Sequence, residues 1–354
     1  MQKKNQICVG IIFGGMSNEH DVSINSAKNI YKAFLKLKNK IFKIRSFYIN
    51  NYGIWFDNKI SESILTGDKK THEKINKSFT PKKTNFMEDL NFNEIDVWFP
   101  IIHGTNGEDG TIQGLLKLTQ KPFIGSGVLG SALGMDKIAM KLIFSHLKIP
   151  QVNYFPIQLQ KLSCDNKNME NLANIILEKL NFPIFIKPSN SGSSLGVSKA
   201  YNKQEIIKGL GEALKIDLRI IAEEGHDIRE LECGIIGKLN LETSLIGEVK
   251  YGKEWYDYES KYSMQNEIVI PAKINRSIEN NLKELAIKGC KALNIDGFAR
   301  ADFFLEKKTN KIFLNEINTI PGFTDKSMFP MLWKASGLEI DQLVAKLVDI
   351  ATES

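Results

Sequence analysis

Residues 298–318 read FARADFFLEKKTNKIFLNEIN, two apolar runs separated by the polar segment 307–311. Both runs have the composition of strands, and so short a connection between them is typical of a β-hairpin. Side chains alternate between the two faces of a strand, so Arg300 and Asp302 share one face. The opposite face of the first run is entirely apolar, with Ala299, Ala301, Phe303 and Leu305. The segment therefore predicts a buried hairpin that keeps one polar face.

That polar face predicts a cation site. If residues 307–311 close a symmetric hairpin, Asp302 lies opposite Glu316. In the same register Arg300 lies opposite Asn318. Opposed carboxylates destabilise a strand pair, and a cation between them removes the repulsion. Carboxylate and amide oxygens favour Mg²⁺, which takes its remaining ligands from water and substrate phosphates. The alternative is a solvated face on which Arg300 neutralises one of the acids.

A loop of small residues follows a predicted strand at 184–187. Residues 187–197 read KPSNSGSSLGV, so a buried strand ends in a lysine and continues into serines and glycines. Backbone N–H groups, hydroxyls and a lysine ammonium are the groups that bind phosphate oxygens. The order differs from a P-loop, because Lys187 precedes the glycines. Alone, such a segment is usually just a turn, but beside a cation-binding hairpin it predicts a phosphate site.

Two more polar segments follow apolar strands near the N-terminus. The run 7–13 (ICVGIIF) leads into Gly14, Gly15 and Glu19, which precedes a predicted helix. Ligands bind at this edge of open α/β sheets, although an acid there also complements the helix dipole. Likewise, His103 opens the glycine-rich segment 103–110 (HGTNGEDG), where a histidine is more often structural. No GxGxxG motif follows the first strand, which argues against a nicotinamide-dependent oxidoreductase.

The remaining pattern predicts a protein of α/β and α+β class. Ser23 is expected to cap the first helix, which continues to Leu37. Residues 57–94 are polar, and we expect loops there. The other predicted strands are 41–49, 96–102, 230–237 and 243–250, and the other predicted helices are 137–147, 169–180, 278–293 and two at the C-terminal end.

Composition excludes several classes of protein. Apolar residues are 42% and charged residues 25% of the chain, which is ordinary for a globular protein. No apolar run approaches the ~18 residues that span a membrane, and the first apolar run is too short for a signal peptide. The net charge of +6 comes mainly from dispersed lysines rather than a concentrated basic element. We therefore expect a cytoplasmic protein that binds neither membranes nor nucleic acid.

Together and in this order, these segments resemble the D-alanine–D-alanine ligase family of the ATP-grasp superfamily. The resemblance runs from residue 14 to residue 330. Its blocks are GGMSNEHDVS, HGTNGEDGTIQG, MDK at 135–137, KPSNSGSSLGVS, YDYESKY at 256–262, VIPA at 269–272, ARADFF and NEINTIPGFTDKSMFP. Residues 51–95 and 160–170 match none of them.

The resemblance implies a three-domain ATP-grasp architecture with ATP held between the central and C-terminal sheets. The implied domains are an N-terminal Rossmann-like domain at 1–134, a central subdomain at 135–222, and a C-terminal subdomain at 223–354 with the metal site and a lid loop.

It also implies an ATP-binding set and a metal site. Two lysines of this set would hold phosphates, Glu230 would bind ribose hydroxyls, and the backbone of the hinge 223–224 would meet adenine. The implied ATP-binding residues are Lys137, Lys187, Ser193, Ser194, Glu223, Glu224, Glu230 and Lys261. Two Mg²⁺ ions, with Mn²⁺ as an alternative, would be held by Asp302, Glu316 and Asn318.

By the same resemblance, two D-alanines are joined for peptidoglycan precursor synthesis. The first would lie near Glu19 and His103, and ATP would convert its carboxylate into an acylphosphate, whose phosphate is a good leaving group. The amine of the second would then attack. Its carboxylate would meet Ser327 and Lys261, and its methyl group Met328.

Further catalytic roles are implied for the oxyanion and for a lid. Arg300 and the N–H of Gly322 would stabilise the tetrahedral oxyanion. A hydrogen-bonded triad of Glu19, Ser193 and Tyr262 would hold the segment 256–262 over the site.

Three alternatives stay open. A D-alanine–D-lactate ligase or another ATP-grasp carboxylate–amine ligase would share most of these residues, although YDYESKY resembles the dipeptide-forming enzymes. A two-lobed solute-binding protein would explain α/β lobes but not the opposed acids at 302 and 316.

The resemblance also implies a homodimer.

Overall fold

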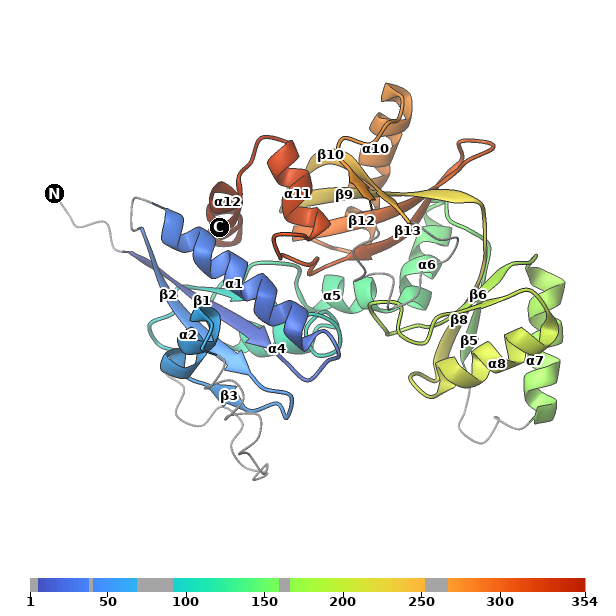
Figure 1. Ribbon diagram of the computed structural model, residues 1–354, viewed down its shortest axis with the longest axis horizontal. Helices are drawn as coiled ribbons and strands as arrows, with labels where there is room; N and C mark the ends of the chain where they lie inside the picture. The colour runs from blue at the N-terminus through green and yellow to red at the C-terminus, as the bar shows by residue number, and fades with distance from the viewer. Residues whose placement is uncertain (1–5, 38–40, 69–91, 159–165, 252–266, 354) are drawn as a thin grey trace.

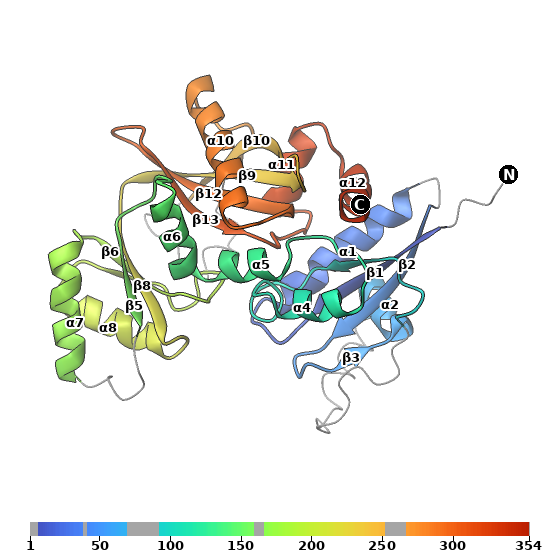
Figure 2. The ribbon, with the colours of Figure 1, turned by 180° about the vertical axis from the view of Figure 1, so that it is seen from behind.

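The computed structural model describes residues 6–37, 41–68, 92–158, 166–251 and 267–353 (Figure 1). They form a mixed α/β structure with three sheets. The N-terminal sheet and the sheet that contains β5–β8 lie at opposite ends of the molecule. The five-stranded sheet lies between them, as both views show (Figure 2). No helix in the described ranges is long and apolar enough to cross a membrane.

The N-terminal sheet has the strand order β3-β2-β1-β4. β1 (Ile7–Gly14) pairs in parallel with β2 (Phe42–Ile49) and β4 (Val97–Pro100), and β3 (Trp55–Phe56) adds an antiparallel edge. Apolar side chains on both faces of β1 are buried, as its sequence predicts. The helices of this region are α1 (His20–Lys36), α2 (Asn58–Thr66), α4 (Thr111–Leu118) and α5 (Val128–Met135).

Two expectations for this region were wrong. Helix α1 begins at His20, so Ser23 does not cap it. Instead, the Ser23 hydroxyl accepts a hydrogen bond from the Gly14 N–H at 2.8 Å and donates to the Ile101 carbonyl, joining β1 to the end of β4. Residues 57–94 are not only loops, because α2 forms there with Asp57 as its N-cap; residues 69–91 lie outside the described part of the chain.

The sheet β5-β8-β6-β7 is antiparallel throughout. Its strands are β5 (Tyr154–Gln158), β6 (Ile184–Pro188), β7 (Ser198–Ala200) and β8 (Arg219–Glu224). Helices α7 (Asn166–Lys179) and α8 (Lys203–Leu214) bury the isoleucine-rich face of this sheet. The opposite face therefore remains available for polar side chains. β8 continues through Glu224, so the expected domain boundary at 222–223 falls inside this strand.

The five-stranded sheet has the order β11-β10-β9-β12-β13. Its strands are β9 (Ile228–Gly237), β10 (Glu242–Lys250), β11 (Glu267–Val269), β12 (Gly297–Glu306) and β13 (Ile312–Asn318). Helices α10 (Arg276–Ala292) and α6 (Lys137–His146) cover one face, and α11 (Met328–Ala335) and α12 (Ile340–Thr352) follow β13. The predicted apolar face of β12 lies in the core beneath α6 and α10.

The predicted register of the hairpin is confirmed, but its symmetric closure is not. Asp302 pairs with Glu316, and Arg300 pairs with Asn318. The register then shifts, so Phe303 pairs with Leu314 and no β12 residue lies opposite Asn315. Such an extra residue is a β-bulge, which re-aims neighbouring side chains. Without this bulge, strict alternation would place Glu316 on the same face as the buried Leu314.

Candidate active site

A cavity of about 2350 Å³ opens between the three sheets. Every predicted site residue in the described ranges lines it. These residues are Glu19, His103, Lys137, Lys187, Ser193, Ser194, Glu223, Glu224, Glu230, Arg300, Asp302, Glu316, Asn318, Gly322, Ser327 and Met328. Lys261 and Tyr262, with the segment 256–262, lie outside the described residues. Polar groups far apart in the sequence therefore meet in one space.

The carboxylates of the hairpin are compensated by neighbouring cations. Arg300 donates from Nε and Nη2 to the two oxygens of Asp302, at 2.7 Å each. The Asn318 amide donates to Asp302 Oδ2 at 2.9 Å, and Lys137 Nζ lies 3.4 Å from Glu316 Oε2. Arg300 thus pairs with one of the two opposed acids, and Lys137 pairs with the other.

Sequence reasoning missed a third acid on this face, Glu232. It lies on β9 directly opposite Asp302, and its Oε2 is 2.9 Å from Arg300 Nε. Burial works to lower the pKa of Arg300, but attraction to Asp302 and Glu232 raises it well above its usual value. Alternation along β9 places Glu230 and Glu232 on the same face of that strand. Only the pairing of β9 with β12 shows that Glu232 lies beside Asp302.

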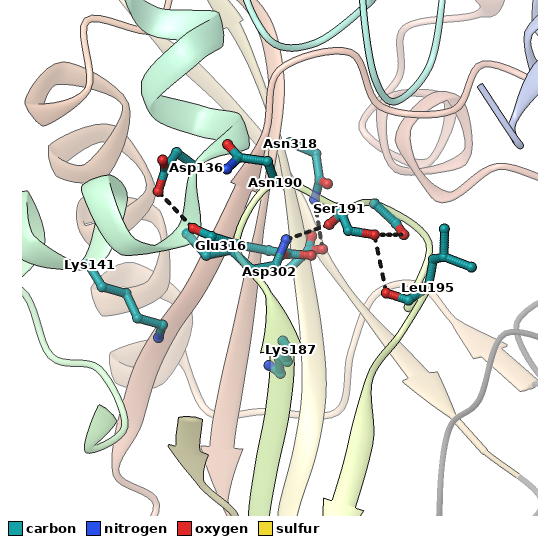
Figure 3. Close-up of polar contacts among 12 residues, drawn as sticks. Asp136, Lys141, Lys187, Asn190, Ser191, Leu195, Asp302, Glu316 and Asn318 are labelled. Atoms are coloured by element: carbon teal, nitrogen blue, oxygen red, sulfur yellow. Dashed lines mark hydrogen bonds and ion pairs between the residues drawn. The ribbon is translucent and has the colours of Figure 1, made fainter. Parts of the chain in front are cut away.

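The oxygen donors fit a divalent cation of the Mg²⁺ type. Asp302, Glu316 and Asn318 offer carboxylate and amide oxygens on adjacent strands, with the cavity in front of them (Figure 3). Among the described residues no group of three or more His, Cys, Asp or Glu side chains is arranged to hold a metal. Mg²⁺ in phosphate sites commonly uses one or two carboxylates plus substrate oxygens, so this donor set is sufficient for it.

Lys137 is positioned by the start of α6. The Asp136 carboxylate caps that helix by accepting the Ala139 N–H at 3.0 Å, and it also accepts the Ser189 hydroxyl at 2.7 Å. Lys137 is thus the first helical residue, and its Nζ donates to the Ser191 carbonyl at 2.8 Å. Because the same ammonium approaches Glu316, the serine-rich loop and the hairpin lie side by side (Figure 3).

The serine-rich loop has an unusual backbone. Ser193 and Ser194 have φ values of 50° and 58°, in the left-handed region that non-glycine residues seldom adopt. The Ser193 hydroxyl donates to the Glu19 carboxylate. Glu19 occupies the N-cap position of α1 without capping the helix through its side chain. Its carboxylate therefore joins the N-terminal region to the loop rather than closing its own helix.

Lys187 points into the cavity from β6 and pairs with Glu223 Oε2 at 2.5 Å. The other oxygen of Glu223 lies 3.1 Å from Lys141, a buried lysine of α6 that sequence reasoning did not select. Burial alone would raise the pKa of Glu223, but the two ammonium groups lower it to about 2. Burial likewise opposes the charge of Lys187, yet attraction to Glu223 raises its pKa.

The hinge after β8 has fewer free backbone donors than expected. The N–H of Glu224 donates to the Asn153 carbonyl at 2.9 Å, and the N–H of Gly225 donates to the Pro183 carbonyl at 2.7 Å. Glu230, further along in β9, accepts the Tyr251 hydroxyl at 2.6 Å. The carboxylate of Glu230 is thus fixed at the cavity wall.

His103 connects the N-terminal region to the loop after β13. Its Nδ1 lies 2.9 Å from the Ile320 carbonyl and its Nε2 3.0 Å from the Ser26 hydroxyl. Burial lowers the pKa of His103, which favours the neutral ring. The nearby Glu108 has a pKa raised well above its usual value by burial and by Glu19. Since both ring nitrogens are engaged, the histidine holds the loop in place.

The loop after β13, which His103 contacts at Ile320, leads to Ser327 and α11 on the cavity wall. The Ser327 hydroxyl accepts the Thr324 N–H at 3.1 Å just before α11, and Met328 is buried at the start of that helix. A Cβ at Gly322 would lie 2.8 Å from Ser327 Oγ, so the backbone passes close to this hydroxyl. A polar group and an apolar side chain therefore adjoin here, as a small amino acid requires.

Comparison with known proteins identifies the family. The family model "D-ala D-ala ligase C-terminus" matches residues 143–349, and "D-ala D-ala ligase N-terminus" matches residues 8–126. D-alanine–D-alanine ligases of Prochlorococcus marinus strains MED4 and MIT 9515 are 61% and 60% identical over 100% of both chains.

Solved structures agree. The VanG D-Ala:D-Ser ligase from Enterococcus faecalis has a TM-score of 0.83 at 31% identity, with 98% of this chain and 100% of that chain covered. The D-alanine–D-alanine ligase from Coxiella burnetii has a TM-score of 0.81 at 29% identity, with 98% and 94% covered. The chain belongs to the D-Ala–D-Ala ligase family.

Proposed function

We propose that this protein joins two D-alanines to D-alanyl-D-alanine while ATP is converted to ADP and phosphate. One observation carries the proposal: the opposed carboxylates of Asp302 and Glu316 share a cavity with Lys137 and Lys187. Acids that bind cations and lysines that bind phosphates, brought from different elements, are what phosphoryl transfer requires. The relatives at 61% and 60% identity carry the name of this ligase.

The nucleotide would lie between the two antiparallel sheets. Lys137 and Lys187 meet its phosphates, together with Ser193 and Ser194 of the loop. Glu230 accepts from the ribose hydroxyls, and the hinge 223–224 lies against the base. Lys261 is assigned to the same set by resemblance alone.

Divalent cations would be held by Asp302, Glu316 and Asn318. When bound, Mg²⁺ or Mn²⁺ supplies positive charge to the phosphates. Arg300, which pairs with both Asp302 and Glu232, would keep Glu232 as a partner if a cation engaged Asp302. Its guanidinium would then be available to an oxyanion.

The first D-alanine would bind with its ammonium near Glu19, in the region that His103 organises. Its carboxylate attacks the γ-phosphorus and ADP leaves, which gives an acylphosphate. The amine of the second D-alanine attacks the acyl carbon. A peptide bond forms, the C–O bond to phosphate breaks, and the amine loses a proton.

The second D-alanine would bind near α11. The Ser327 hydroxyl, with Lys261, meets its carboxylate, and the buried Met328 contacts its methyl group. Arg300 and the Gly322 N–H stabilise the tetrahedral oxyanion. The triad of Glu19, Ser193 and Tyr262 closes the lid, and its Glu19–Ser193 part is formed among the described residues.

The proposal extends to organisation. We assign one domain to each sheet. The first covers 1–134, and the boundary between the second and third, expected at 222–223, is moved to the end of β8 at Glu224. The protein would act as a homodimer in the cytoplasm, where ATP and D-alanine are both supplied.

A substrate panel tests this function. Phosphate release from ATP is measured with D-alanine, L-alanine, D-lactate and D-serine, with and without Mg²⁺. We expect release that needs Mg²⁺ and D-alanine together. Release with L-alanine equal to that with D-alanine would overturn the proposal, as would D-alanine-independent release.

A further inference from the structure

Lys141 is a buried lysine that the proposed mechanism does not use. It lies one turn beyond Lys137 on α6, so both side chains point to the same side of the helix. Only 1% of the residue is exposed, whereas the Lys137 side chain is 16% exposed. Long lysine side chains usually keep the ammonium in water, so complete burial of this group needs a reason.

The ion pair of Lys141 among the described residues is with Glu223. Its Nζ lies 3.1 Å from Glu223 Oε1 and 5.7 Å from the centre of the Tyr154 ring. Tyr154 is the β5 partner of Glu223, so sheet pairing sets both contacts. The narrow gap among Lys141, Lys187, Glu223 and Glu316 leaves no room for a water molecule. The Lys141 ammonium is therefore buried away from bulk solvent.

Glu223 is shared between two lysines. Its Oε2 contacts Lys187, which points into the phosphate end of the cavity, while its Oε1 contacts Lys141. One carboxylate thus faces two lysines, while Glu316, which lines the same gap, pairs with Lys137. If Lys141 were neutral, the same carboxylate would compensate Lys187 fully and hold it away from a ligand.

We propose that Lys141 is a positioning residue for nucleotide phosphates: it shares Glu223 with Lys187 and so leaves the Lys187 ammonium available to them. The inference rests on the proposed ATP-binding function and adds a residue to it. Figure 3 shows Lys141 on α6 and Lys187 on the β6 strand, below the hairpin acids. Lys141 acts through Glu223 and does not itself touch the ligand.

The test separates phosphate binding from base binding. Calorimetric titrations with ADP and with adenosine, both with MgCl₂, compare the wild type with Lys141→Met, a variant of similar length without charge. We expect ADP affinity to fall about tenfold, since a charge-assisted hydrogen bond is weakened, and adenosine affinity to stay unchanged. In turnover assays the KM for ATP rises and the KM for D-alanine does not. Lys179→Met, at an exposed position near the end of α7, is the matched control and should equal the wild type.

A double variant tests whether Lys141 acts through Glu223. In a Glu223→Gln background the carboxylate that would capture Lys187 is gone, so adding Lys141→Met should cause no further loss of ADP affinity. If Lys141→Met alone does not fold, Lys141→Gln replaces it, and the same comparison is made.

Two results would overturn the inference: unchanged ADP affinity in Lys141→Met, or an equal loss for ADP and adenosine, which indicates general damage. A further loss in the Glu223→Gln background would also overturn it. Failure of the wild-type protein to bind ADP would instead refute the proposed function itself.

Discussion

Arg300 binds both carboxylate oxygens of Asp302, with Nε and Nη2 each 2.7 Å from one of them. Asp302 is also a proposed cation ligand, so the guanidinium and the cation compete for it. Glu232 offers Arg300 a second anchor at 2.9 Å from Nε. The position of Arg300 in the cation-bound state should therefore depend on Glu232.

Replacing that anchor should raise the Mg²⁺ requirement. In Glu232→Gln, Arg300 loses this anchor and keeps its two hydrogen bonds to Asp302, so a cation displaces Arg300 from Asp302 at a greater cost. We expect the Mg²⁺ concentration for half-maximal turnover to rise on the order of tenfold. Losing a residue that positions a metal ligand commonly weakens metal binding 10–100-fold. Magnesium titrations of phosphate release measure this. An unchanged midpoint would mean that Glu232 does not take up Arg300.

Removing a proposed cation ligand should lower turnover more strongly than replacing Glu232. Glu316→Gln keeps the shape of the side chain but removes its charge, and we expect turnover to fall by more than about 100-fold at any Mg²⁺ concentration. The fold should persist, because the change also removes repulsion from Asp302 across the hairpin. Circular dichroism and thermal melting provide the control for folding. Normal turnover at ordinary Mg²⁺ would refute the cation site.

The phosphate role of Lys187 predicts selectivity between ligands. Lys187→Ala should weaken ATP binding more than D-alanine binding, on the order of tenfold, because it removes a charge from the phosphate end only. Glu223 keeps Lys141 as a partner in this variant, so the buried carboxylate is not left alone. Separate calorimetric titrations with ATP and D-alanine measure both affinities. An equal loss of the two would make the residue structural.

Glu223 should make stability depend on pH in the acid range. The pKa of Glu223 is about 2 in the folded protein, below the ordinary glutamate value of 4.5, so Glu223 binds its proton more readily when the protein is unfolded. Its contribution, about 3 kcal/mol, is present above pH ~4.5 and is lost as pH falls toward ~2. The difference in unfolding free energy between wild type and Glu223→Gln should therefore shrink on acidification.

Urea unfolding at a series of pH values measures this difference. The exposed Glu178 provides the control, since Glu178→Gln should follow the wild type throughout. A difference for Glu223→Gln that stays constant from pH 7 to pH 3 would contradict the pairing with two lysines.

The hairpin shows how far sequence reasoning reaches. Alternation along β12 predicted its buried and polar faces, and loop length predicted that Asp302 lies opposite Glu316. The bulge at Asn315 was not predicted, because nothing in its type distinguishes an extra residue from a paired one. The pairs beside the loop are offset by one residue from the predicted register, as in Leu305 with Ile312, and the bulge restores that register, so Asp302 faces Glu316.

Contacts between distant segments could not be derived in this way. Ser23 was assigned to a helix cap on local preference, yet it connects two strands. Lys141 and Glu232 look like ordinary charged residues of a helix and a strand. Their partners, Glu223 and Arg300, come from elements whose neighbours only the folded sheets define. Family resemblance supplied the residues proposed to touch ligands, but not Lys141 and Glu232, which pair with those residues.

We expect this cavity to form D-alanyl-D-alanine in preference to other products. Residues 250–266 contain no histidine, so the lid segment carries no group that becomes cationic near neutrality and favours an anionic hydroxy acid. Tyr262→Phe should lower turnover without changing this preference, because it affects closure of the lid and not the acceptor. The comparison of the two proteins therefore separates turnover from selectivity.

Mass spectrometry of a reaction with ATP, Mg²⁺, D-alanine and excess D-lactate and D-serine is the most direct measurement. From pH 6 to pH 9 we expect D-alanyl-D-alanine as the dominant product, with one phosphate released per dipeptide and only a trace of depsipeptide. A depsipeptide or a D-alanyl-D-serine product in the majority at pH 6 would contradict the account.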